Sequence, residues 1–243
     1  MLHFYEEKEC WQKKMRPVNK GETSRVYTKH SEAKDDLRNA LGAYCSYCEM
    51  NIANGMDIEH VSPKSKNLAL SVSWDNFLIA CKVCNRLKSN INECRGGYVF
   101  PDTHNTAYAY QYSQEGVAIN NNLDEAEQQL ALNTLNLVQL NRTVDSTERK
   151  DDRHVQRLVE WGKAQESLKD YENMQSPEMK RQVVRSHAGF ISSWLEIFKD
   201  YPEVKKELLE SINGTNFNCY DDFRYFPVAV LELPACCIFK GDE

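Results

Sequence analysis

The 243-residue sequence lacks any apolar run near the roughly 18–20 residues that a membrane span needs. Its most apolar stretch, 228–239, is interrupted by Glu232 and Pro234. The first residues are acidic, whereas a signal peptide opens with basic residues and continues with apolar ones. No internal repeat of fixed period is present. We therefore expect a soluble, cytoplasmic protein that does not associate with membranes.

Basic charge is scarce in the second half of the chain. Residues 101–243 carry 15 Lys and Arg against 24 Asp and Glu, a net charge of −9. Residues 1–100 carry 15 against 12, a net charge of +3. Attraction to the phosphate backbone supplies most non-specific affinity for nucleic acid. Any contact with nucleic acid is therefore expected in the first hundred residues or with the help of a partner.

Cysteine, in contrast, is abundant. The chain has nine cysteines, and the odd number argues against a framework made only of disulfides. Four of them form two C-x-x-C pairs, Cys45 with Cys48 and Cys81 with Cys84. Two such pairs can hold one Zn²⁺ in a tetrahedral site whose role is structural, because four sulfur ligands leave no open position. The alternative is that these cysteines are only small buried hydrophobic residues.

The spacing of apolar residues predicts a helix with Ser31 as its N-cap and Gly42 as its stop, and short strands around 58–61 and 77–80. A short helix is predicted over 85–91, and four amphipathic helices after about residue 122. The chain then divides into three parts: an N-terminal arm and helix at 1–44, a core at 45–100 that holds the metal-like chemistry, and a mainly helical region at 101–243.

Polar residues stand in a distinctive order between and after the cysteine pairs. They are Asp57-Ile-Glu59-His60-Val-Ser-Pro63, then Trp74-Asp75-Asn76, then Asn85-Arg86-Leu87-Lys88. Together with the cysteines, this set resembles the HNH endonuclease superfamily over about residues 45–90. The resemblance implies an α+β fold with a zinc-supported ββα-metal (HNH) core and a largely α-helical C-terminal half.

The resemblance also implies catalytic roles. His60 would be the general base that deprotonates the attacking water, a role that suits a side chain titrating near neutrality. Glu59 and Asn85 would bind one divalent cation, and the oxygen of Asn85, where many family members have a second histidine, favours Mg²⁺ or Mn²⁺. Asp57 is a weaker candidate ligand on the same strand face as Glu59. Asn76 would brace the loop between the strands.

Four basic residues near the motif are candidates for contacts to the phosphates that flank the scissile bond: Lys64, Lys66, Arg86 and Lys88. For Lys64 and Lys66, a solvated charged face without a partner is an equal alternative.

Further segments resemble a narrower group, the PtuB family of HNH nuclease subunits in Septu and some retron anti-phage systems. They are 16–21, 27–29, 41–49 and 135–142. This resemblance implies an ABC/SMC-like ATPase partner of the PtuA type and, in retron systems, a reverse transcriptase with its RNA–DNA hybrid. It favours DNA as the substrate and leaves tRNA open.

Three classes of function therefore remain at this point. The first is a metal-dependent nuclease in a defence complex, and the second is a zinc-supported nucleic-acid binding module without activity. The third is a redox protein that uses Cys45 and Cys48, which leaves the second pair unexplained. In the helical region, the apolar stripes Leu123/Ala126/Leu130 and Val183/Phe190/Trp194 predict a module that docks a partner. The alternative is a helical lid that packs only on itself.

Overall fold

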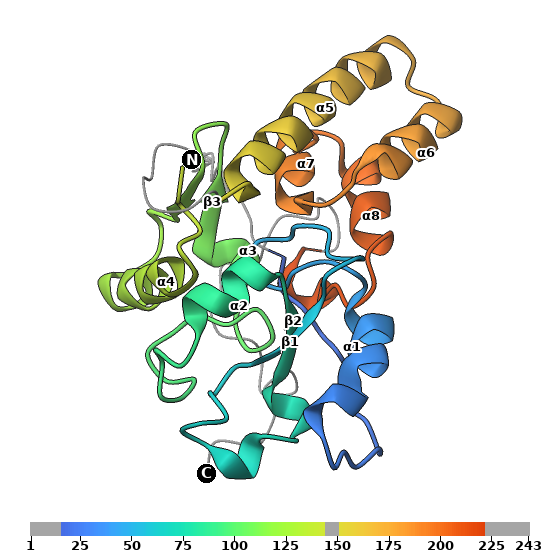
Figure 1. Cartoon of the computed structure of the whole chain (residues 1–243). Coiled ribbons are helices and arrows are strands. Elements are labelled where there is room, and N and C mark those ends of the chain that lie inside the picture. The colour runs from blue at the N-terminus through green and yellow to red at the C-terminus, as the bar shows by residue number, and fades with distance from the viewer. Residues whose placement is uncertain (1–15, 144–150, 222–243) are drawn as a thin grey trace, which may run out of the picture.

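The computed structural model describes residues 16–143 and 151–221. Cys10, Cys236 and Cys237 lie outside these ranges, as does the segment from Phe223 onward, whose sequence predicts a strand or an extended tail. The α+β class is confirmed: helices dominate the chain and two small antiparallel sheets accompany them (Figure 1). Within the described part of the chain, no helix combines the length and the apolarity needed to cross a membrane.

The N-terminal helix forms close to its predicted place but begins differently. A 3₁₀ turn, η1 (His30–Ala33), leads into α1 (Lys34–Leu41), which buries Leu37 and Leu41. Gly42 ends α1 with φ 75°, a conformation that glycine adopts without steric cost. The prediction of Ser31 as N-cap was wrong, because η1 already begins at His30 and no side chain caps it.

The central element is a hairpin followed by a helix. Strands β1 (Asp57–His60) and β2 (Phe77–Ala80) pair antiparallel, with Asp57 opposite Ala80. The connection between them holds two 3₁₀ turns, η2 (Leu68–Leu70) and η3 (Trp74–Asn76). Helix α2 (Lys82–Lys88) follows β2 directly. It starts three residues before the predicted position because the Cys81 thiol accepts the backbone N–H of Cys84 and acts as the N-cap.

The remaining elements are mainly helical, as predicted. They are α3 (Thr106–Ala109), β3 (Tyr110–Tyr112), β4 (Val117–Ile119), α4 (Glu125–Val138), α5 (Arg153–Asn173), α6 (Pro177–Ser186), α7 (Ile191–Ile197), α8 (Pro202–Glu210) and η4 (Phe217–Cys219). Helix α4 opens with a complete capping box between Asp124 and Glu127, and α6 opens with Ser176 as N-cap and Pro177 in the first turn.

One break in the helical region ties it to the cysteine segment. The apolar pattern after Pro177 predicts a single helix through Leu195, but the chain turns between α6 and α7 at Gly189 (φ 127°) and Phe190 (φ 48°). Gly189 forms a β-bridge with Met50. A Cβ at Gly189 would lie 2.9 Å from the Glu49 carbonyl oxygen, so this close approach requires glycine.

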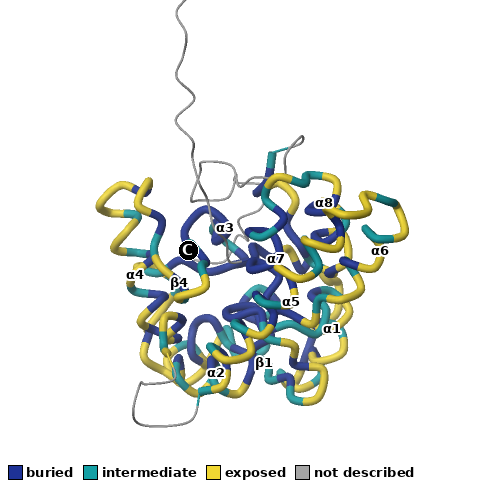
Figure 2. The backbone as a smooth tube through the Cα atoms, turned by 90° about the horizontal axis from the view of Figure 1, so that it is seen from above, coloured by how far each residue is buried: buried dark blue, intermediate teal, exposed yellow. Residues whose placement is uncertain are grey.

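Two hydrophobic clusters fill the interior. The first joins the hairpin, α1 and α4 and contains Leu123; the second joins α5 to α8 and contains Val183 and Trp194. Figure 2 shows α7 in the buried interior and exposed residues along the outer parts of α4 and α6. Of the apolar stripes on which the docking prediction rests, Leu123, Val183, Phe190 and Trp194 are buried within the chain, whereas Ala126 is exposed.

Candidate functional site

The four paired cysteines meet in one buried cluster. The turn at 45–48 and the first turn of α2 bring the four Sγ atoms within 4.8 Å of one another. Cys48 Sγ and Cys81 Sγ are 3.7 Å apart. Four sulfurs about 2.3 Å from a tetrahedral zinc ion would lie about 3.8 Å from each other. The cluster therefore fits a single structural Zn²⁺.

Backbone hydrogen bonds fix the first cysteine turn to the hairpin. The Cys45 N–H donates to the Met50 carbonyl, and the Ser46 N–H donates to the Ile79 carbonyl of β2, both at 2.9 Å. The Glu49 carboxylate, which is buried, accepts hydrogen bonds from the backbone and hydroxyl of Ser192 in α7. A metal in this cluster would join the 45–48 turn to the end of β2 and to α2, and Glu49 ties the same turn to α7.

Helix α5 buries two arginines and leaves two apolar side chains exposed, and the first of the arginines reaches this cluster. Val155 and Val159 are 43% and 52% exposed, whereas Arg153 and Arg157 are each 3% exposed. Arg153 Nη1 donates to Cys84 Sγ at 3.1 Å and to the Val138 carbonyl at 2.8 Å.

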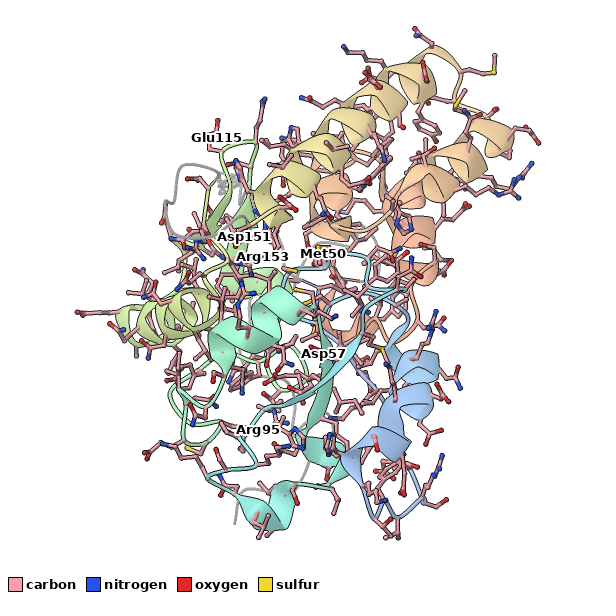
Figure 3. All side chains as sticks on the ribbon, viewed as in Figure 1. Met50, Asp57, Arg95, Glu115, Asp151 and Arg153 are labelled. Carbon is pink, nitrogen blue, oxygen red and sulfur yellow. The ribbon has the colours of Figure 1, made fainter. Side chains whose placement is uncertain are left out.

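Both arginines are held in place by further contacts. Asp151 accepts Arg153 Nη2 at 2.7 Å, and Figure 3 shows the two residues side by side. Arg157 stacks on Tyr112 and Phe190, with centroid distances of 5.7 and 5.5 Å. A Cys₄ zinc site carries net negative charge, and a buried guanidinium offsets it.

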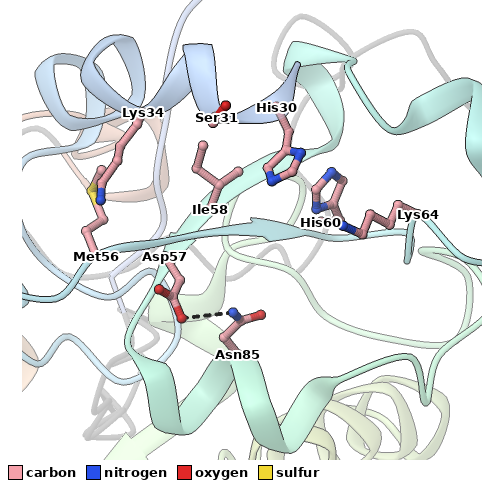
Figure 4. A pocket seen from close by; sticks show the side chains of 9 residues that line it. All are labelled: His30, Ser31, Lys34, Met56, Asp57, Ile58, His60, Lys64 and Asn85. Atoms are coloured by element: carbon pink, nitrogen blue, oxygen red, sulfur yellow. Dashed lines mark hydrogen bonds between the residues drawn. The ribbon is translucent and has the colours of Figure 1, made fainter.

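A second feature of the hairpin is an open pocket of about 460 Å³ along β1 (Figure 4). It brings together four of the predicted site residues: Asp57, His60, Lys64 and Asn85. The full lining is His30, Ser31, Lys34, Met56, Asp57, Ile58, His60, Lys64 and Asn85.

His60 has the hydrogen-bonding state that a general base needs. Its Nε2 lies 3.0 Å from the Ser71 carbonyl oxygen. A carbonyl only accepts, so Nε2 carries the proton and Nδ1 keeps a free lone pair. Partial burial lowers the pKa of His60, the hydrogen bond with the Ser71 carbonyl opposes this, and the nearby charges of Lys64 and Lys88 lower the pKa further. The ring is therefore neutral at pH 7 and able to accept a proton. Phe77 holds it edge-on at 5.1 Å.

Asn76 braces the loop that follows His60. Its amide oxygen accepts the Ser62 N–H at 2.7 Å, and its Nδ2 donates to the Ser62 carbonyl at 2.9 Å and to the Leu70 carbonyl at 3.2 Å. The side chain is 2% exposed, so it does not reach the pocket. Asn76 acts on the site through the backbone rather than by touching a substrate.

Asp57 and Asn85 form the oxygen-rich end of the pocket. Asn85 Nδ2 donates to Asp57 Oδ2 at 3.0 Å, and the Asn85 amide oxygen points away from this bond (Figure 4). Outside the cysteine cluster, no group of three or more His, Cys, Asp or Glu side chains placed to hold a metal is present in the described ranges. Two oxygen donors suit Mg²⁺ or Mn²⁺, which Asp57 and Asn85 would hold together with waters and substrate oxygens.

Glu59 does not join them, which corrects the predicted ligand set. Its carboxylate is 2% exposed, and its Oε1 lies 2.6 Å from Lys88 Nζ. Burial raises the pKa of Glu59 to about 7, against the opposing attraction of Lys88. Asp57 and Glu59 both face α2. Asp57 accepts a hydrogen bond from Asn85 in the middle of α2, whereas Glu59 pairs with Lys88, one turn later in the same helix. Of the two carboxylates, only Asp57 reaches the pocket.

Lys88 also corrects the predicted set of phosphate-binding residues. Its side chain is fully buried, and its Nζ donates to the His60 carbonyl at 2.8 Å in addition to pairing with Glu59. Lys64 is exposed and lines the pocket. Lys66 is exposed and pairs with Glu93 at 3.3 Å, and Arg86 is exposed on α2, but neither lines the pocket.

Two residues at the pocket were missed by the sequence analysis. His30 and Lys34 lie one turn apart at the start of the N-terminal helix. They precede the first cysteine pair and belong to no part of the motif, so no spacing in the sequence connects them to His60. Only the packing of η1 against β1 brings them to the site.

Residues 45–90 match the family model of the HNH endonuclease. The chain thus carries an HNH domain, whose family generally hydrolyses nucleic acids, and the match covers both cysteine pairs, the hairpin and α2. A comparison with curated proteins finds no match.

Proposed function

We propose that the chain is a metal-dependent endonuclease that hydrolyses phosphodiester bonds of nucleic acid in the pocket along β1. The observation that carries the proposal is the state of His60: its Nδ1 is unprotonated and free, in a pocket that also holds the oxygen donors Asp57 and Asn85. A module that only binds nucleic acid has no need of such a base. A redox role is not favoured, because both cysteine pairs meet in one cluster.

In the proposed reaction, His60 Nδ1 takes a proton from a water molecule, and the water oxygen attacks the phosphorus. The bond from phosphorus to the leaving oxygen breaks, and that oxygen departs with the electron pair. Asp57 and Asn85 would hold a divalent cation, whose positive charge would offset the charge that develops on the phosphate. Asn76, through the Ser62 backbone, keeps the loop after His60 in place.

We further propose that DNA is the favoured substrate, with tRNA as the other candidate, and that the enzyme acts in the cytoplasm within an anti-phage defence complex. The partner would be an ABC/SMC-like ATPase of the PtuA type, joined in retron systems by a reverse transcriptase with its RNA–DNA hybrid. The support is the resemblance of the segments around the HNH motif to PtuB. Co-purification of the chain with an ATPase encoded beside it tests this part.

Cleavage by three proteins tests the nuclease. The wild type, His60→Ala and Asn85→Ala, each with the partner ATPase, are incubated with duplex DNA, single-stranded DNA and tRNA across a Mn²⁺ titration. His60→Ala should lose about 10²- to 10⁴-fold in rate at every Mn²⁺ concentration, because the proton acceptor is gone. Asn85→Ala should recover part of its rate as Mn²⁺ rises.

Three outcomes would contradict the mechanism. Cleavage by the wild type in EDTA would remove the role of the metal, and rescue of His60→Ala by Mn²⁺ alone would make His60 a ligand. Binding of nucleic acid without cleavage of any of the three substrates would favour the binding module.

A further inference from the structure

A second histidine stands beside the proposed base. The ring centroids of His30 and His60 are 5.3 Å apart, with their planes at 66°. His30 lines the same pocket, half-buried, and comes from η1, outside the stretch that matches the HNH family. Figure 4 shows the two rings next to each other above β1.

The position of His30 is fixed by packing, not by the motif. Ala33 and Leu37, in the turns that follow His30, are buried against the hairpin in the first hydrophobic cluster. In the described ranges, the His30 ring forms no hydrogen bond. The imidazole is therefore held at the pocket wall with its ring nitrogens available, as expected of a group that binds a ligand.

The charges around His30 suit an anion. Lys34, four residues later, and Lys64, from the loop after β1, line the same pocket, and both are exposed. The single carboxylate in the lining, Asp57, lies at the α2 side and is already bonded to Asn85. Imidazole and ammonium N–H groups bind phosphate oxygens strongly and set the register of a nucleic-acid backbone.

We propose that His30 binds the scissile phosphate by donating an N–H to a non-bridging oxygen, while Lys34 and Lys64 hold the neighbouring backbone phosphates. This inference rests on the proposed nuclease function. It extends the active site from the HNH motif to the N-terminal helix, and it places the substrate backbone between α1 and the loop after His60. His60 then faces the phosphorus from the same wall as His30.

Matched variants separate substrate binding from simple ring packing. His30→Phe keeps the edge-to-face contact with His60 but has no N–H, and His30→Gln restores a donor without the ring. Lys34→Ala removes a charge inside the pocket, whereas Lys29→Ala removes one from an exposed position that does not line it. Thermal melting of each variant checks the fold.

Two readouts are used, and the first does not depend on cleavage. Fluorescence anisotropy with a labelled 20-mer, as duplex and as single strand, measures affinity in EDTA. We expect His30→Phe and Lys34→Ala to bind more weakly than the wild type and Lys29→Ala to bind like it. In the cleavage assay with Mn²⁺ and the partner ATPase, His30→Phe should lose about 10- to 100-fold in kcat/KM, and His30→Gln should recover part of the loss.

The outcomes distinguish this inference from the proposed function. If the wild type does not cleave but His30→Phe weakens binding, the nuclease function fails and the phosphate contact stands. If the wild type cleaves and His30→Phe matches it in both assays, the inference is overturned and the ring only packs. A His30→Phe loss that His30→Gln does not recover at all, with normal melting of both, also overturns it, because the ring and not the donor then matters.

Discussion

The hairpin β1–β2 contributes to two regions that differ in how deeply their side chains are buried. At the cysteine cluster, all four side chains are buried, and Arg153 donates to a thiol. At the pocket, His60, Asn85 and His30 are half-buried, and each keeps at least one polar atom without a protein partner in the described ranges. The buried cysteines hold the fold, whereas groups that do chemistry keep atoms free for a ligand.

This difference predicts that replacing a cysteine of the cluster abolishes folding, whereas replacing a catalytic residue of the pocket abolishes only activity. Cys84→Ser tests the first half and should have the largest effect. A structural zinc contributes on the order of 10 kcal/mol of folding free energy, so the variant should lose roughly one zinc per chain and most of its soluble, folded protein. Zinc content by elemental analysis and circular dichroism measure both.

Cys94→Ser is the matched control for this experiment. Cys94 is an exposed free cysteine outside the cluster, so its replacement should change neither zinc content nor folding. Soluble Cys84→Ser protein with a full complement of zinc would show that the cluster is only a set of buried thiols.

The buried ion pair of Glu59 and Lys88 joins β1 to the end of α2. Lys88→Met should destabilise the protein by about 3–5 kcal/mol, because it leaves the Glu59 carboxylate buried without its partner. The double variant Glu59→Gln with Lys88→Met should recover much of the loss. Urea unfolding of the zinc-loaded protein measures these differences.

Lys82→Met, an exposed change at the start of the same helix, should be close to neutral in unfolding. If instead Lys88→Met leaves stability unchanged and weakens nucleic-acid binding, Lys88 contacts phosphate, as the sequence alone suggested.

The parts of the site that depend on local order were predictable from the sequence. The two C-x-x-C pairs and the two strands follow from spacing and apolar runs, whereas the role of Asn76 follows from the resemblance to the HNH family. The choice between Asp57 and Glu59 did not follow, because alternation puts both carboxylates on one face of β1. The placement of α2 against β1 decides that Asn85 donates a hydrogen bond to Asp57 and that Lys88 forms an ion pair with Glu59.

Tertiary packing also decides which face of α5 is buried, and the apolar pattern of this helix does not predict that face. A helix is expected to bury its apolar stripe, yet α5 exposes Val155 and Val159 and buries Arg153 and Arg157. The reason lies far away in the sequence, at Cys84 and at the rings of Tyr112 and Phe190. His30 escaped prediction for the same reason, because its partner at the pocket is 30 residues away.

The smallest predicted effect concerns Arg153. Removing its hydrogen bond to Cys84 should loosen zinc, because outer hydrogen bonds typically contribute about 10- to 100-fold in metal affinity. Arg153→Met should release zinc about tenfold faster than the wild type when a thiol-reactive mercurial is added in the presence of a chromogenic chelator. Arg157→Met is the matched control, since Arg157 is equally buried one turn later but stacks on aromatic rings. Equal release rates for the two variants would show that the guanidinium packs beside the cluster without tuning it, and nuclease activity per zinc-loaded molecule should stay at the wild-type level in both.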